Sequence, residues 1–151
     1  MARTLLQVVA LVLTALALVP SGAHFFELPA KIGMSEGEYF TVQQIYLGWR
    51  WFGVVLIGAL ASDIALMVVL RGGAASFWFA GVGSFAVATT LAVFFVWILP
   101  ANVATTNWSI APANWQELRT QWEYGHAVNA VITLVALTSV TLAIALSRRV
   151  D

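Results

Sequence analysis

The sequence holds two histidines, and each lies three residues from a glutamate. His24 precedes Glu27 in the run His-Phe-Phe-Glu, whereas His126 follows Glu123 in the run Glu-Tyr-Gly-His. Residues three apart lie on one face of an α-helix, so each motif presents an imidazole and a carboxylate together. If the two helices run in opposite directions, the histidines lie at one depth and the glutamates lie about one turn further out.

Two imidazoles and two carboxylates could bind a divalent metal such as iron, zinc, copper or manganese. The candidate ligands are His24, Glu27, Glu123 and His126. Bundle sites built on Glu-x-x-His hold two irons with about four carboxylates, and only Glu117 is an obvious third here, so a mononuclear site is the easier fit. Without a metal, a histidine oriented by a carboxylate could transfer protons. The cofactor is therefore open between one divalent metal and none.

The same residues also allow a purely structural interpretation. Glu27 could pair with Arg50, and Glu123 could pair with Arg119, which lies four residues before it. The histidines would then only form hydrogen bonds at the membrane interface. We favour a functional site, because polar groups at membrane depth are costly and usually serve function.

The composition indicates that these motifs belong to a membrane protein. Of 151 residues, 61% are hydrophobic and 9% are charged, and the mean hydropathy is +0.89. So few charges could not cover the surface of a soluble fold. Seven basic residues balance seven acidic ones, so we expect no nucleic-acid partner. The sequence has no cysteine, which excludes disulfides, thiolate nucleophiles and iron–sulfur clusters.

Four apolar segments, each of about 20 residues, predict four membrane-spanning helices. We expect these helices over about residues 4–29, 41–71, 75–100 and 114–148. Short connections make consecutive helices antiparallel neighbours, so the predicted fold is all-α, an up-down-up-down bundle forming one domain over residues 1–151. The first and fourth helices are neighbours in such a bundle, which would bring the two histidine motifs together.

The N-terminal segment allows a second interpretation. Residues 1–23 contain Arg3, an apolar run and a small-residue ending, Ser21-Gly22-Ala23, and so resemble a signal peptide. Cleavage there would leave three helices. We favour a spanning helix, because the apolar run is long for a signal sequence and the basic region is a single arginine.

Basic residues predict the orientation in the membrane. Arg3, Arg71, Arg148 and Arg149 lie on one side of the predicted helices, whereas Lys31 stands alone in the opposite loops. Since basic loops stay in the cytoplasm, both termini are predicted to be cytoplasmic, in a bacterial inner membrane. The expected partners are membrane lipid and a lipophilic small molecule, with a second copy of the chain or a larger membrane complex as a further option.

Polar and aromatic side chains on the outer side predict a substrate pocket capped by the connection over residues 100–112. The candidate substrate-binding residues are Asn102, Trp115, Trp122 and Arg50. Asp63 is different, because it lies about 20 Å along the second helix from Arg50 and well inside the membrane. A structural hydrogen bond is predicted for it, with Ser84, Thr89 or Thr90 as the candidate partner.

The segment that opens the fourth predicted helix resembles the signature of a known family. The sequence has Pro-x-Asn at Pro100 and Asn102, followed by Trp-x-x-Leu-Arg-x-x-Trp-Glu-x-x-His from Trp115 to His126. This pattern is similar to that of the anthrone-oxygenase-like family of small four-helix membrane proteins. The sequence departs from the pattern at Gln121 and Asn129, where many members have a basic residue.

The resemblance implies a reaction, because fungal members of the family oxidise anthrones to anthraquinones with dioxygen. It implies that His126 or His24 abstracts an acidic C–H proton and that Arg119 stabilises the resulting enolate. A bound metal could supply the activation instead. The leading hypothesis is therefore a small membrane oxidoreductase or oxygenase that acts on a lipophilic aromatic compound.

Two other functions also fit the sequence. The chain could be a non-catalytic accessory subunit of a larger membrane complex, since it has no soluble domain and nearly featureless apolar faces. It could also be an electron-transfer protein in which His24 and His126 bind a haem or a metal.

Overall fold

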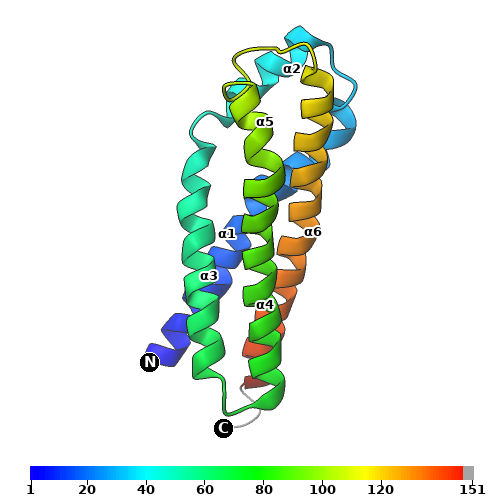
Figure 1. The fold of residues 1–151 in the computed structure, drawn as a ribbon. Coiled ribbons are helices and arrows are strands. Elements are labelled where there is room, and N and C mark those ends of the chain that lie inside the picture. The colour runs from blue at the N-terminus through cyan, green and yellow to red at the C-terminus, as the bar shows by residue number, and fades with distance from the viewer. Residues whose placement is uncertain (148–151) are drawn as a thin grey trace.

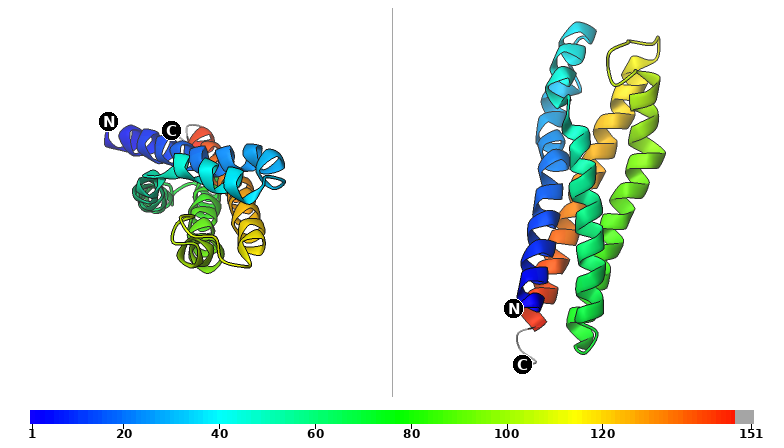
Figure 2. Two further views of the ribbon diagram at one scale, coloured as in Figure 1. Left: turned by 90° about the horizontal axis from the view of Figure 1, so that it is seen from above. Right: turned by 90° about the vertical axis from the view of Figure 1, so that its left-hand side faces the viewer.

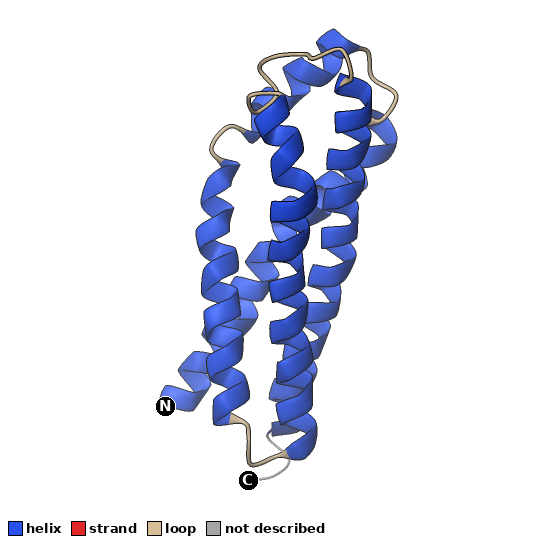
Figure 3. Ribbon diagram, in the orientation of Figure 1, coloured by secondary structure: helices blue, strands red, loops and turns tan. Residues whose placement is uncertain are grey.

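The chain folds into four long helical stretches that lie side by side (Figures 1 and 3). The computed structural model describes residues 1–147, and every regular element there is a helix. The stretches that are long and apolar enough to cross a membrane are Ala2–Lys31, Trp49–Val69, Ala74–Ala104 and Trp115–Ser147. The predictions of an all-α chain and of four candidate membrane-spanning helices are thus confirmed.

The first and last helices are direct neighbours. Helix α1 (Ala2–Lys31) packs against α3 (Phe52–Val69) and α6 (Trp115–Ser147), and α4 (Ala74–Val93) packs against the same two helices. At one end of the molecule, the Arg3 guanidinium donates to the Ser147 carbonyl at 3.2 Å. At the other end Lys31 contacts Glu123, so α1 and α6 run in opposite directions (Figure 2).

Small and polar residues share the space between the helices with larger apolar side chains such as Leu66 and Val140, while many other large apolar side chains are exposed. Ala10 and Thr14 of α1 are fully buried, so the segment that resembles a signal peptide packs into the core of this structure. A Cβ atom added at Gly83 of α4 would lie 2.8 Å from the Val140 side chain of α6, so the glycine permits close helix contact. Exposed side chains such as Phe85 suit a lipid environment.

The second predicted helix, over residues 41–71, is interrupted in the structure. The chain forms α2 (Glu36–Gln43) and the short 3-10 turns η1 (Gln44–Tyr46) and η2 (Trp49–Trp51) before α3 begins. Gly48 separates the two turns with a φ of 92°, a left-handed conformation that side chains with a Cβ disfavour. The break places α2 across the end of the molecule, opposite the N-terminus (Figure 1).

The third helical stretch continues beyond its predicted end at residue 100. A π-helical turn, η3 (Phe94–Ile98), joins α4 to α5 (Leu99–Ala104), and Pro100 lies in the first turn of α5, where its missing N–H group is tolerated. The fourth predicted helix matches α6 up to the last described residue. Arg148 and Arg149, which support the predicted orientation, lie outside the described residues.

Candidate functional site

The two histidines meet where α1 passes α6, as the mirrored motifs predict. Their ring centroids lie 4.2 Å apart. His24 is buried, whereas His126 is partly exposed. Trp122, one turn before His126, packs against both rings with centroid distances of 4.6 Å to His24 and 4.3 Å to His126. The antiparallel pairing of the two helices therefore produces a histidine pair at one depth.

Lys31, the last residue of α1, lies beside this pair and is only 2% exposed. Its ammonium group lies 2.9 Å from the Glu123 carboxylate, donates to the Tyr46 hydroxyl at 3.1 Å and lies 3.4 Å from Nδ1 of His24. These three acceptors match the three N–H donors of an ammonium group. The sequence predictions use Lys31 only as a loop charge, although its spacing of seven residues from His24 places both on one helix face.

Lys31 also links the two glutamates of the motifs. Its ammonium nitrogen lies 3.6 Å from Glu27, whose side chain is 38% exposed, and Glu123 on its other side is fully buried. The predicted pairs of Glu27 with Arg50 and of Glu123 with Arg119 are therefore replaced by a shared lysine. One Glu123 oxygen, Oε2, is buried without a hydrogen-bond partner among the described residues.

Two tyrosines complete the site, and the break at Gly48 brings both of them there. The Tyr39 hydroxyl donates to Glu123 at 2.9 Å, and the Tyr46 hydroxyl donates to Glu27. Burial and the negative charge of Glu123 raise the pKa of Tyr39. Burial and the hydrogen bond to Glu27 raise the pKa of Tyr46. Both phenols therefore keep their protons and act as donors at neutral pH.

These residues form one contiguous group, which we name the outer polar cluster because it lies toward the end of the molecule opposite the N-terminus. Its members are His24, Glu27, Lys31, Tyr39, Tyr46, Glu123 and His126. The sequence predicts four of these residues as site residues. It does not predict Lys31, Tyr39 or Tyr46 in that role. The partners of the two tyrosines lie on other elements of the chain, whereas the spacing of Lys31 from His24 and Glu27 is a signal within one helix.

The contact with Lys31 assigns the tautomer of His24. An ammonium group has only donors, so Nδ1 of His24 accepts the hydrogen bond. The proton of the neutral imidazole is therefore assigned to Nε2. The two histidines thus differ, because His24 is fixed as an Nε2–H donor, whereas His126 has no such constraint from a lysine.

The predicted arginines lie apart from the histidines. Arg119 donates to the Met34 carbonyl at 2.6 Å, and its guanidinium lies 4.7 Å from the centroid of the Trp115 ring. Arg50 lies over the Trp51 ring at 5.7 Å. Trp115 and Arg119 thus fasten the connection between α1 and α2 to α6, and Lys31 is the cation beside the histidines.

Asn102 orients the tryptophan that packs on the histidines. Its side-chain oxygen accepts hydrogen bonds from the indole N–H groups of Trp108 at 3.1 Å and Trp122 at 2.8 Å. Trp108 is buried because the chain makes a left-handed turn at Thr106, Asn107 and Trp108, with φ of 49°, 54° and 63°. Such a turn costs about 1–2 kcal/mol per residue, which the packing and hydrogen bonds of Trp108 help to offset.

The predicted metal ligands do not assemble into a metal site. Within residues 1–147, no group of three or more His, Asp or Glu side chains is placed to hold a metal ion. The ammonium of Lys31 stands between the carboxylates of Glu27 and Glu123 and would repel a cation there. The rings of His24 and His126 are in direct contact, so a haem does not fit between them.

Asp63 lies far from this cluster, in the middle of α3, and is fully buried. The Thr14 hydroxyl lies 3.1 Å and 3.3 Å from its two carboxyl oxygens. The predicted partners do not contact it, because the hydroxyls of Ser84, Thr89 and Thr90 donate to carbonyls of their own helix. Asp63 thus links α3 to α1 rather than to α4.

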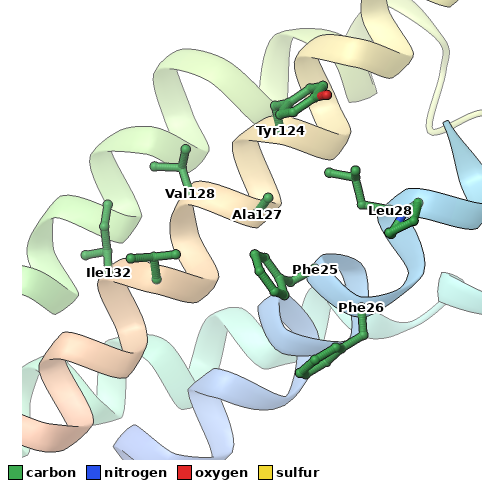
Figure 4. Close-up of a pocket in the computed structure, with 9 residues that line it drawn as sticks. Phe25, Phe26, Leu28, Tyr124, Ala127, Val128 and Ile132 are labelled. Atoms are coloured by element: carbon green, nitrogen blue, oxygen red, sulfur yellow. The ribbon is translucent and has the colours of Figure 1, made fainter.

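An apolar groove of about 580 Å³ lies between α1 and α6 near the histidine pair (Figure 4). It is lined by Phe25, Phe26, Leu28, Pro29, Tyr124, Ala127, Val128, Val131 and Ile132. Phe25 follows His24 in the sequence, and Ala127 follows His126. The groove is large enough for a small molecule, for which pockets are roughly 300–1,000 Å³.

Comparison with known proteins finds no matching family model, no matching curated protein and no matching solved structure.

Proposed function

We propose that this chain is a small membrane oxygenase that oxidises an activated C–H group of a lipophilic aromatic ketone, with His126 as the base. The contact between His126 and His24 carries the proposal, because the buried ammonium of Lys31 fixes His24 as an Nε2–H donor and places no such constraint on His126. The resemblance of residues 99–130 to the anthrone-oxygenase-like family supports the same reaction class.

The proposal places the four helices in a bacterial inner membrane as an up-down-up-down bundle. Arg3 lies in the first turn of α1, and Arg71 lies in the connection from α3 to α4, which Figure 1 shows at the same end of the molecule as the N-terminus. This placement supports a cytoplasmic location of both termini. The outer polar cluster is then near the outer surface. An apolar substrate reaches it laterally from the lipid, and the groove between α1 and α6 offers an apolar surface at this level.

The overall reaction converts a methylene group and dioxygen into a carbonyl group and water. His126 takes the first C–H proton, and the carbanion, stabilised as an enolate, forms a C–O bond with dioxygen. The resulting peroxide anion takes a proton. Loss of the second C–H proton then forms the carbonyl as the O–O bond breaks, and the departing hydroxide takes a proton to become water.

Within the cluster, His24 stabilises charge and supplies protons, and Lys31 positions it. His24 donates from Nε2 to the enolate oxygen or to the reduced oxygen atoms, and Lys31 holds His24 in the tautomer that this requires. His24 thus takes the role that the resemblance implies for Arg119. Trp122 keeps the two rings together, and Asn102 fixes Trp122.

The test is oxygen consumption by the purified protein with anthrone as the probe. Replacing His126 by Ala should lower the rate about 100-fold or more, as expected for a positioned general base. Thr138→Ala is the matched control, because Thr138 is exposed on α6 and bonds only to its own helix. Unchanged oxygen consumption in folded His126→Ala protein would remove His126 from the mechanism.

One observation favours a second candidate, the non-catalytic accessory subunit. All three N–H donors of Lys31 are used within the chain, as they would be if Lys31 only held α1, η1 and α6 together. On this alternative, the protein purifies with a stoichiometric membrane partner, and His126→Ala changes neither that association nor any oxygen consumption.

A further inference from the structure

A continuous series of polar groups leads from buried His24 to the outside of the protein. Nδ1 of His24 lies 3.4 Å from the Lys31 ammonium, which lies 3.1 Å from the Tyr46 hydroxyl. The Tyr46 hydroxyl in turn donates to Glu27. The His24 side chain is 4% exposed and that of Glu27 is 38% exposed. The series therefore joins an enclosed imidazole to a carboxylate that solvent reaches.

The other carboxylate of the cluster does not provide such an exit. Glu123 accepts from Lys31 and from Tyr39, and both Glu123 and Tyr39 are 0% exposed. Beyond Tyr39 lie the rings of Trp108 and Trp115, at centroid distances of 5.1 Å and 6.3 Å, the amide of Gln43 and the Arg119 guanidinium, which is 5.4 Å from the Tyr39 ring. Neither an amide nor a guanidinium relays protons at neutral pH. A proton that reached Glu123 would have no polar group to move to except back to Lys31 or Tyr39.

We propose that Lys31, Tyr46 and Glu27 form a proton-exchange path between the outer solution and His24, and that Glu123 is the fixed counter-ion of Lys31. The charged and titratable groups that face Lys31 are His24 and Glu27 from α1, Tyr46 from η1 and Glu123 from α6. Tyr39 of α2 donates to Glu123 and lies under the Arg119 guanidinium, which is 5.4 Å from its ring centroid, and His126 contacts His24.

Each step along the path moves one proton and no electrons. When His24 gives up its Nε2 proton, Lys31 supplies a proton to Nδ1. Glu27 takes a proton from the outer solution and passes it to Tyr46, as Tyr46 passes its own hydroxyl proton to the neutral amine of Lys31. A proton accepted later at Nε2 of His24 drives the same steps in reverse and restores the original tautomer.

The path itself does not depend on the proposed oxidation, although the use of its proton rests on that function. In the proposed reaction, two protons are taken from carbon and two are added to oxygen, so the site gains no net proton over a cycle. An exchange path allows proton removal from carbon and proton donation to oxygen to occur at different times. His24 can donate a proton before His126 has released the proton that it took from carbon.

The test follows the exchange of the His24 ring proton with water by NMR, in full-length protein carrying ¹⁵N-histidine. His126→Asn assigns the two ring signals. Glu27→Gln and Tyr46→Phe should each slow the exchange about tenfold or more, since each removes a proton-transfer group. Added acetate should restore fast exchange in Glu27→Gln, because a soluble carboxylate can replace the missing one.

Tyr39→Phe is the matched control, because Tyr39 makes the same kind of hydrogen bond to a glutamate but lies on the closed side of Lys31. Glu36→Gln controls for loss of an exposed carboxylate that contacts none of these groups. Both controls should exchange as the unchanged protein does. If Tyr39→Phe slows exchange as much as Tyr46→Phe, or if Glu27→Gln has no effect, the path is wrong.

Glu27→Asp keeps a carboxylate and provides a second variant if Glu27→Gln does not fold. Its shorter side chain should give exchange slower than in the unchanged protein, with partial recovery on addition of acetate; exchange as fast as in the unchanged protein would contradict the path. The measurement needs no substrate, so its outcome is independent of whether anthrone is oxidised.

Discussion

The outer polar cluster and the Asp63–Thr14 pair are both buried between helices, but they differ in charge balance and in connection. Lys31 in the cluster contacts two carboxylates, a phenol and an imidazole. Asp63 has a single hydroxyl as its partner, and within residues 1–147 it takes part in no ion pair.

The difference indicates where the chain can do chemistry. A cation shared among acceptors allows a proton to move while the total charge of the group stays constant, and Glu27 connects that group to solvent. The Asp63–Thr14 contact has neither property, so we interpret it as a link between α1 and α3. Hydrogen bonds between membrane helices average about 0.6 kcal/mol, which fits such a role.

The largest expected effect comes from breaking the cluster at Lys31. Lys31→Met leaves Glu123 buried without a cation, which should lower the free energy of unfolding by about 3–5 kcal/mol. Unfolding in mixed detergent with increasing dodecyl sulfate, followed by circular dichroism, measures this change. The double variant Lys31→Met with Glu123→Gln should recover most of the loss. If the double variant is as unstable as the single one, the ion pair is not the cause.

Removing the Tyr39 hydroxyl should have the next largest effect. Tyr39→Phe loses a hydrogen bond to a charged group, which contributes about 1.5–3 kcal/mol. The folded-state pKa of Tyr39 is raised, so its contribution is fully present below the ordinary tyrosine pKa of about 10 and is lost as pH rises above it.

Unfolding measured from pH 7 to 12 therefore distinguishes Tyr39→Phe from the unchanged protein. The unchanged protein should lose stability steeply above pH 10, with tyrosinate absorbance appearing as it unfolds. Tyr39→Phe should be less stable at pH 7 and should lose less stability above pH 10, since only Tyr46 then contributes to the alkaline loss. An identical alkaline loss in both proteins would contradict the raised pKa of Tyr39.

Changes at the Asp63–Thr14 pair should be smaller. Thr14→Val removes the one hydroxyl that contacts Asp63 and should cost up to about 1.7 kcal/mol, the upper end for membrane hydrogen bonds. Asp63→Asn keeps an acceptor for Thr14 and should cost less than Thr14→Val. The detergent unfolding assay compares the two variants with Lys31→Met. If Asp63→Asn lowered the free energy of unfolding as much as Lys31→Met, Asp63 would have to form an ion pair that the structure of residues 1–147 does not show.

The smallest expected effect lies at the start of α2, outside both regions. Glu38 accepts hydrogen bonds from the Ser35 hydroxyl at 2.6 Å and the Ser35 backbone N–H at 2.9 Å, which together lower the pKa of Glu38. Its contribution is therefore present above its ordinary pKa and is lost as pH falls through the lowered value.

Glu38→Gln should flatten this acid-side dependence slightly, as measured by unfolding between pH 2 and 6. Glu36 lies two residues earlier and has no hydrogen bond to Ser35, so Glu36→Gln should leave the pH dependence unchanged. Equal effects of the two variants would indicate general charge repulsion rather than the cap.

The approach of the two histidines could be predicted because it depends on local periodicity and on one simple tertiary rule. A spacing of three residues fixes which side chains share a helix face, and antiparallel neighbours bring mirrored motifs to one depth. The arginine partners could not be predicted in the same way. Arg119 is near Glu123 in the sequence, and Arg50 lies at the expected depth of Glu27. Neither kind of proximity determines which cation enters the interface between the helices.

The sequence by itself determined the lipid environment that this protein needs and the helical secondary structure that it forms. The chain is 61% hydrophobic and has four long apolar runs, which indicates lipid contact and helices that satisfy their own backbone hydrogen bonds. The resemblance to anthrone-oxygenase-like proteins also comes from the sequence, and the reaction it implies is a hypothesis for the oxygen-consumption test.

Only the tertiary structure decided which groups share charge at the outer end. Gly48 interrupts the predicted second helix, and α2 and η1 then carry Tyr39 and Tyr46 to the glutamates. Lys31 lies between those glutamates because α1 ends where α6 presents Glu123. Such partners come from segments far apart in the chain, and helix periodicity describes only which side chains share a face, not which segment returns to cover it.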